Sequence, residues 1–152
     1  AIKFEGYFPE HVRCLKKNDI PVVCHLGLLP QTHVKKTLQG KTDSEAELLL
    51  KQAKELEKQG ASALVLELIP EEVARNITQA LSIPTIGIAA GRHCDGQVQI
   101  IQDILGLTEK KFKHVRQYCD IGTSIKTALH DYVQDVKNKS LLNAEHSFHS
   151  TP

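Results

Sequence analysis

Short apolar runs alternate with helical patterns along the first part of the chain. Each run is β-branched or leucine-rich and is followed by a helical pattern, which is typical of strands buried in a parallel sheet. The runs predict strands at residues 2–5, 20–26, 63–68 and 83–88. The intervening patterns predict helices at residues 9–18 and 42–60, and a third helix that begins at residue 70. This alternation predicts an α/β fold with parallel strands joined by crossover helices.

The number of βα units distinguishes two architectures. Four or five units are too few for a complete (β/α)8 TIM barrel but fit its second half. An open doubly wound sheet is the alternative, although no G-x-G-x-x-G motif follows the first strand. We therefore expect residues 1–137 to form the second half of a barrel. Residues 138–152 are polar and lack periodicity, and we expect a loosely ordered C-terminal tail there.

Signals are weaker in the later part of the chain. Val98 to Ile101 is apolar enough for a fifth short strand. Beyond it, we predict helices at residues 109–118 and 121–137.

Composition narrows the class of protein. Apolar residues make up 41% and charged residues 24% of the 152 residues, as in an ordinary globular domain. The net charge of +1 implies no general attraction to nucleic acid or to an anionic membrane. No apolar run approaches the roughly 20 residues of a membrane span and no cleavable signal opens the chain, so we expect a cytoplasmic protein. The chain lacks methionine and starts inside a predicted strand, so we expect it to be the later part of something longer.

Titratable residues close three of the predicted strands. Lys3 and Glu5 end the first, His25 the second and Glu67 the third. If these strands are neighbours, the four side chains converge at the carboxyl ends of the sheet, where α/β enzymes keep their catalytic groups. Two alternatives stay open, namely an internal ion pair between Lys3 and Glu5 and a satisfied core histidine at His25. Burial would raise the pKa of Glu67 and suit it to proton transfer.

Together these groups suit enolate chemistry. One carboxylate can bind a hard cation, a second can take an α-proton, and an ammonium can stabilise oxyanion charge. A single metal carboxylate is incomplete, because Mg²⁺ usually takes one or two carboxylates together with substrate oxygens and waters. The segment His93-Cys94-Asp95 is no strong metal motif, since adjacent residues on an extended chain point apart and no second ligand pair follows at metal spacing.

A series of short motifs carries a family resemblance over almost the whole chain. They are Ile2-Lys3-Phe4-Glu5-Gly6, His25-Leu26-Gly27-Leu28 with Pro30-Gln31, Gln39-Gly40, Val65-Leu66-Glu67, residues 83–88, Asp95-Gly96-Gln97 and Glu145-His146-Ser147-Phe148. In this order and spacing, the chain resembles the C-terminal half of the ketopantoate hydroxymethyltransferase (3-methyl-2-oxobutanoate hydroxymethyltransferase) family.

The resemblance implies a (β/α)8 barrel of the phosphoenolpyruvate/pyruvate type, commonly a large homo-oligomer. It implies transfer of a hydroxymethyl group from 5,10-methylenetetrahydrofolate to 3-methyl-2-oxobutanoate, which gives 2-dehydropantoate in pantothenate biosynthesis. The reaction is a metal-assisted enolisation with Mg²⁺. By motif, Glu5 corresponds to the metal-linked carboxylate and Lys3 to the contact with the 2-oxo acid. Glu67 corresponds to the proton acceptor, and His25 lies in the substrate pocket.

The chain also departs from the family pattern. Gly6-Tyr7 replaces a Gly-Gly pair, the loop at residues 30–41 is shortened, and Ala89-Ala90-Gly91 replaces Gly-Ala-Gly. We expect a chain that lacks the first half of the barrel to be inactive by itself. Two other hypotheses are a non-catalytic remnant that serves in assembly or binding, and a related carbon–carbon lyase that acts on another 2-oxo acid.

Overall fold

The computed structural model describes residues 1–150, which belong to two compact units. The first unit runs from Ala1 to Gln99, and the second begins at Ile100. This division differs from the expected boundary after residue 137, and the assignment of residues 100–137 to a barrel stays a prediction. Among residues 1–150, no helix is both long and apolar enough to cross a membrane.

A five-stranded parallel sheet forms the centre of the first unit. Its strands are β1 (Ile2–Lys3), β2 (Val22–Gly27), β3 (Ala63–Glu67), β4 (Thr85–Ile88) and β5 (Gly96–Gln97). They lie in the order β1-β2-β3-β4-β5, and every neighbouring pair is parallel. Strands that follow one another in both sequence and space are the arrangement of a (β/α)8 barrel, whereas a doubly wound sheet reverses its order at a switch point. The predicted α/β class is confirmed.

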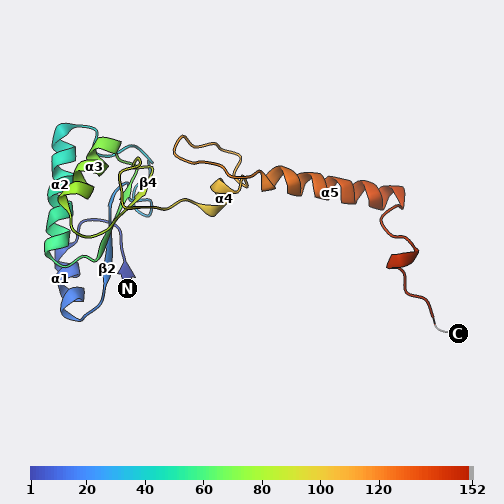
Figure 1. Cartoon of the computed structure of the whole chain (residues 1–152), viewed down its shortest axis with the longest axis horizontal. Helices are drawn as coiled ribbons and strands as arrows, with labels where there is room; N and C mark the ends of the chain where they lie inside the picture. Colours follow the sequence, from blue (N-terminus) through green and yellow to red (C-terminus); the bar gives the residue numbers. More distant parts are fainter. Residues whose placement is uncertain (151–152) are drawn as a thin grey trace. The chain divides into compact units, whose positions relative to one another are not determined.

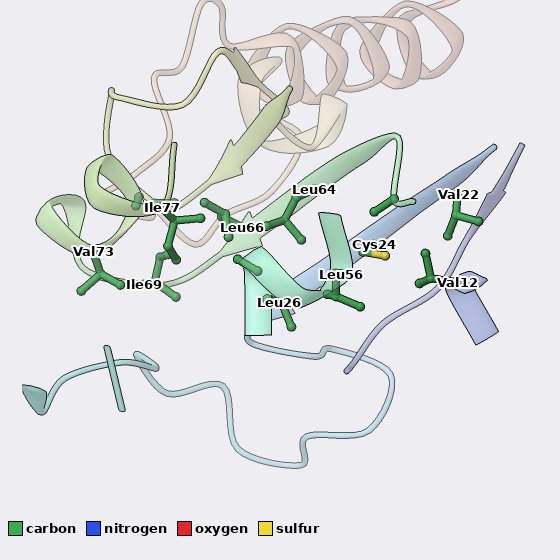
Figure 2. Packing of buried hydrophobic residues seen from close by; sticks show 14 residues of the cluster. Val12, Val22, Cys24, Leu26, Leu56, Leu64, Leu66, Ile69, Val73 and Ile77 are labelled. Carbon is green, nitrogen blue, oxygen red and sulfur yellow. The ribbon is translucent and has the colours of Figure 1, made fainter. Parts of the chain in front are cut away.

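Three helices cover one face of this sheet. They are α1 (Pro9–Lys17), α2 (Asp43–Lys58) and α3 (Glu71–Ala80), and they lie on the same side of the strands (Figure 1). One continuous apolar cluster joins them to the sheet (Figure 2). Its fully or nearly fully buried members on the strands and helices are Val12, Val22, Cys24, Leu26, Ala53, Leu56, Leu64, Leu66, Val73, Ala74 and Ile77. A doubly wound sheet would need helices on both faces, so this one-sided cover also favours the barrel arrangement.

Local sequence signals explain where the long helix α2 begins. Thr42 is its N-cap, and the Thr42 hydroxyl accepts a hydrogen bond from the Glu45 amide at 3.3 Å. The Glu45 carboxylate accepts in return from the Thr42 amide at 3.1 Å, which completes a capping box. Both residues satisfy amides that would otherwise lack partners in the first turn.

The second unit contains α4 (Ile101–Ile104), α5 (Ile121–Asn138) and a 3₁₀ turn, η1 (Ala144–His146). The helix predicted at residues 121–137 is confirmed by α5. The tail predicted from residue 138 contains η1, and its last two residues lie outside the described part of the chain.

The helix predicted at residues 109–118 is wrong, because this segment forms bends and turns. A helix would have stacked the like charges of Lys110, Lys113 and Arg116 at successive i, i+3 positions, which is unfavourable. Instead, the Arg116 guanidinium lies over the Tyr118 ring, 5.2 Å from its centroid.

The strand predicted at residues 98–101 is also wrong, since β5 lies at Gly96–Gln97 and α4 starts at Ile101. Asp95 sets this position. Its carboxylate accepts hydrogen bonds from the Thr85 amide at 2.8 Å and the Thr85 hydroxyl at 2.9 Å. The residues directly after Asp95 are thereby held beside the start of β4.

Gly27 ends β2 and is required by the backbone there. Its φ is +93°, and an added Cβ would overlap the Glu67 carbonyl oxygen and lie 2.8 Å from Ile69 Cγ2. We predict that Gly27→Ala lowers the free energy of unfolding by about 3 kcal/mol, through left-handed strain and overpacking. Urea unfolding measures this loss. Gly96→Ala is the matched control, because its added Cβ would meet Ile86 Cγ1 at an ordinary 3.7 Å. We expect it to cost less than about 1 kcal/mol, and equal losses in the two variants would contradict the explanation.

Candidate active site

The four titratable residues singled out in the sequence lie together on the sheet face opposite the helices. The alternation of side chains along each strand determines which face of the sheet each residue occupies. In β2, Val22, Cys24 and Leu26 point to the helices, so His25 points the other way. The parallel register places His25 beside Val65 and Gly27 beside Glu67. The predicted convergence of Lys3, Glu5, His25 and Glu67 is therefore what the structure shows.

His25 is the centre of this group, and only 3% of it is exposed. Its Nδ1 atom lies 3.2 Å from Lys3 Nζ and 3.9 Å from Glu5 Oε1. Its Nε2 atom lies 3.3 Å from Glu67 Oε2, but with an angle that does not make a hydrogen bond. Because one ring nitrogen is buried without a hydrogen bond among residues 1–150, His25 is not the fully satisfied core histidine of the alternative interpretation.

The His25 ring is held neutral by its surroundings. Burial, followed by the positive charge of Lys3, lowers the pKa of His25 from 6.5 to about 4. The Glu5 carboxylate and the Leu28 backbone act in the opposite direction but with less effect. At neutral pH the ring therefore carries no charge, although it lies near two carboxylates.

Two hydrogen bonds from backbone amides position Glu5. Although β1 ends at Lys3, the Gly6 amide still bonds the His25 carbonyl at 3.0 Å, which keeps Glu5 level with His25. The Glu5 side chain is 8% exposed, and its Oε2 atom accepts a hydrogen bond from the Gln31 amide at 3.1 Å. This leaves oxygen lone pairs that can bind a cation.

Glu67 closes β3, and its side chain is 19% exposed. Burial raises the pKa of Glu67 above its ordinary value, and the negative charge of Glu5 raises it further. Lys36 and Lys3 lower it in part. A carboxylate whose pKa is raised in this way is a better proton acceptor than an exposed one.

Two contributors to this site were absent from the sequence-based set of residues. The backbone amide of Gln31 holds Glu5, and the charge of Lys36 acts on Glu67. Both lie in the loop that follows β2, and loops at the carboxyl ends of parallel strands are where such groups are expected. Their position in this loop is the feature of the sequence that could have indicated that they belong to the site.

The structure brings two carboxylates, an ammonium and a neutral imidazole together at one edge of the sheet. Within residues 1–150, no group of three or more His, Cys, Asp or Glu side chains is arranged to hold a metal ion. The Glu5 carboxylate could supply one oxygen ligand to a cation, whose other ligands would then be waters or substrate oxygens.

The fold and this site are those of an α/β protein with an enzyme-like cluster at the carboxyl ends of parallel strands. A model of the ketopantoate hydroxymethyltransferase family matches residues 1–141, and the chain belongs to this family. It is 46% identical over 154 residues to the 3-methyl-2-oxobutanoate hydroxymethyltransferase of Syntrophotalea carbinolica, covering 97% of this chain and 58% of that protein. The protein of the same name in Geobacter metallireducens is 45% identical over the same shares. The chain thus spans little more than half the length of these relatives.

A solved structure of the YdjI aldolase from Escherichia coli K12 is also similar to this chain, with a TM-score of 0.41 and 17% sequence identity. The similarity covers 89% of this chain and 50% of the aldolase.

The lowered pKa of His25 makes stability depend on pH. As the pH falls through 6.5 towards 4, the unfolded chain takes up a proton at His25 that the folded chain does not. We predict that the free energy of unfolding falls by about 2 kcal/mol between pH 7 and pH 5 from this residue. The raised pKa of Glu67 acts in the opposite direction, because the folded chain then binds that proton more readily.

Urea unfolding of the parent chain and of His25→Gln at several pH values isolates the contribution of His25. We expect the difference between the two chains to shrink as the pH falls. His130→Gln, at an exposed position of α5, is the control and should follow the parent at every pH. A His25→Gln variant with the same pH dependence as the parent would contradict the assignment.

Proposed function

We propose that this chain supplies the proton-transfer part of a ketopantoate hydroxymethyltransferase active site. The substrate is 3-methyl-2-oxobutanoate, the one-carbon donor is 5,10-methylenetetrahydrofolate, and the product is 2-dehydropantoate. The family membership supports this reaction class. The observation that carries the proposal is the placement of Glu67 against a buried, neutral His25, with Lys3 and Glu5 on the same face.

Glu67 is the proposed base. The C3–H bond of the 2-oxo acid breaks, the proton moves to the Glu67 carboxylate, and the electron pair forms the C2–C3 double bond of an enolate. The nucleophilic C3 then forms a bond to the methylene carbon of the folate, and water supplies the hydroxyl oxygen of the new hydroxymethyl group. The two C–N bonds to the folate break, and tetrahydrofolate leaves with one proton from the water and the one that Glu67 had taken. The raised pKa of Glu67 supports its role, because it brings the pKa of the base closer to that of the weakly acidic C3–H bond of the substrate.

Lys3 and Glu5 provide one positive and one negative charge on the Nδ1 side of His25, opposite Glu67. The Lys3 ammonium can bind a carboxylate or keto oxygen of the substrate, since it has donors left after its contact with His25 Nδ1. Glu5 would hold a divalent cation as one carboxylate ligand. Such a cation, when bound, stabilises the negative charge that develops on the keto oxygen.

Exchange of the substrate C3 proton in D₂O, without folate, tests the enolisation step by itself. The protein is a chimera in which this chain is joined to the part of the Syntrophotalea carbinolica relative that it does not span. Proton NMR follows loss of the C3 signal in the presence of Mg²⁺. We predict exchange by the chimera and a loss of about 10²-fold or more in Glu67→Gln, because the base is removed and the shape of the side chain is kept.

Glu72→Gln is the matched control, since Glu72 is an exposed acid on α3, which packs on the other face of the sheet. It should leave the exchange rate unchanged. A folded chimera that exchanges no proton would reject the proposed activity and favour a non-catalytic remnant. Full exchange in Glu67→Gln would reject Glu67 as the base.

A further inference from the structure

We infer that Lys3 holds the neutral His25 as its Nε2–H tautomer, so that the one N–H of this buried ring faces the Glu67 carboxylate. The two ring nitrogens of a neutral histidine are not equivalent, because one donates and the other accepts. The contacts around His25 distinguish them. Lys3 thereby acts on Glu67 through His25, as a positioning residue, in addition to its proposed contact with substrate.

The contact at Nδ1 decides which nitrogen accepts. Lys3 Nζ lies 3.2 Å from His25 Nδ1, within hydrogen-bond distance. A lysine ammonium has three donors and no acceptor, so Nδ1 must supply the lone pair. The opposite tautomer would set an N–H against an ammonium. The carboxylate oxygen on that side of the ring, Glu5 Oε1, is 3.9 Å from Nδ1 and too distant to compensate. The Leu28 carbonyl also acts on the ring as an acceptor, but it makes no hydrogen bond of good geometry with either ring nitrogen.

The ring proton is therefore on Nε2, where Glu67 Oε2 lies 3.3 Å away. The ring is 3% exposed, and Nε2 has no aligned hydrogen bond among residues 1–150. A buried donor without a partner is costly, so a small rotation that aligns Nε2–H with the carboxylate is favourable. Catalytic hydrogen bonds are often long before substrate binds and tighten in the complex.

The consequence for Glu67 rests on the proposed function. An N–H on one carboxylate oxygen fixes the plane of the group and leaves the second oxygen to accept the substrate proton. Misplacement of a catalytic group by about 1 Å can cost about 10²-fold in rate, so this orientation matters. The tautomer itself does not depend on any activity, and it can be measured in the chain alone.

NMR of the ¹⁵N-histidine-labelled chain at pH 8 identifies the tautomer directly. Two-bond ¹H–¹⁵N correlations give each ring nitrogen the shift of a protonated or of an unprotonated atom, and His25→Gln identifies the His25 signals by their loss. We expect Nδ1 of His25 to be unprotonated and Nε2 to be protonated. The reverse pattern, or an average of the two, would overturn the inference.

Substitutions of Lys3 test whether this residue sets the tautomer. Lys3→Met removes the donor, and Lys3→Gln offers an oxygen that can accept from Nδ1–H, so both should move the His25 shifts towards the other tautomer. Lys3→Arg keeps a side chain that only donates and should retain the parent pattern. Lys36→Met is the matched control, because the Lys36 ammonium acts on Glu67 by its charge, as Lys3 does, but is not the donor to His25 Nδ1. Unchanged His25 shifts in a folded Lys3→Met chain would overturn the role of Lys3.

Exchange kinetics of the chimera test the step from His25 to Glu67. The amide nitrogen of Gln can take the place of Nε2, whereas that of Asn can take only the place of Nδ1. We expect His25→Asn to lower kcat for exchange by about 10²-fold at an unchanged KM, and His25→Gln to recover a part of this loss. Equal kcat in the two variants would overturn the positioning role. Absence of exchange in the parent chimera would reject the proposed function, whereas the tautomer measured by NMR would still stand.

Discussion

The parallel pairing of β2 with β3 is the constraint on which the rest of the first unit depends. Its register sets His25 beside Val65 and Gly27 beside Glu67. A shift by one residue would turn His25 and Glu67 into the apolar cluster beneath the helices, where neither charge nor hydrogen bonding could be satisfied. Gly27 is compatible with this register because it has no side chain, whereas a Cβ at this position would overlap the Glu67 carbonyl oxygen.

Side chains alternate between the two faces of the sheet, so the same strands contribute to the apolar core and to the candidate site. Cys24 and Leu26 of β2, like Leu64 and Leu66 of β3, are buried against α1, α2 and α3. The residues between them face the opposite side, where His25 and Glu67 lie with the side chains of β1 and the turn after it. The apolar face holds the backbone rigid, and a rigid backbone is what fixes distances near 3 Å between polar groups on the other face.

Local sequence was sufficient for the parts of the fold that depend on alternation and capping. The helix predicted at residues 42–60 begins where α2 does, at the Thr42 cap, and the predicted convergence of Lys3 and Glu5 follows from the alternation of side chains along the first strand. Local sequence was insufficient where a tertiary contact determines the position of an element. The hydrogen bonds of the Asp95 carboxylate hold β5 ahead of the predicted strand, and a helix around Lys113 would have brought like charges together, which is mildly unfavourable. No local pattern contains the distance between His25 and Glu67, because it depends on the pairing of distant strands.

The charges of the site favour the proposed chemistry. With His25 neutral, Lys3 and Lys36 contribute two positive charges, and Glu5 and ionised Glu67 contribute two negative charges. The group is then neutral overall, and a 2-oxo acid would bring a negative charge into a poorly solvated place, which is unfavourable unless a positive group lies close to it. The Lys3 ammonium, and a divalent cation held by Glu5 when bound, would supply that positive charge. Transfer of the substrate proton to Glu67 would leave a negative charge on the enolate oxygen, which the same two groups would stabilise.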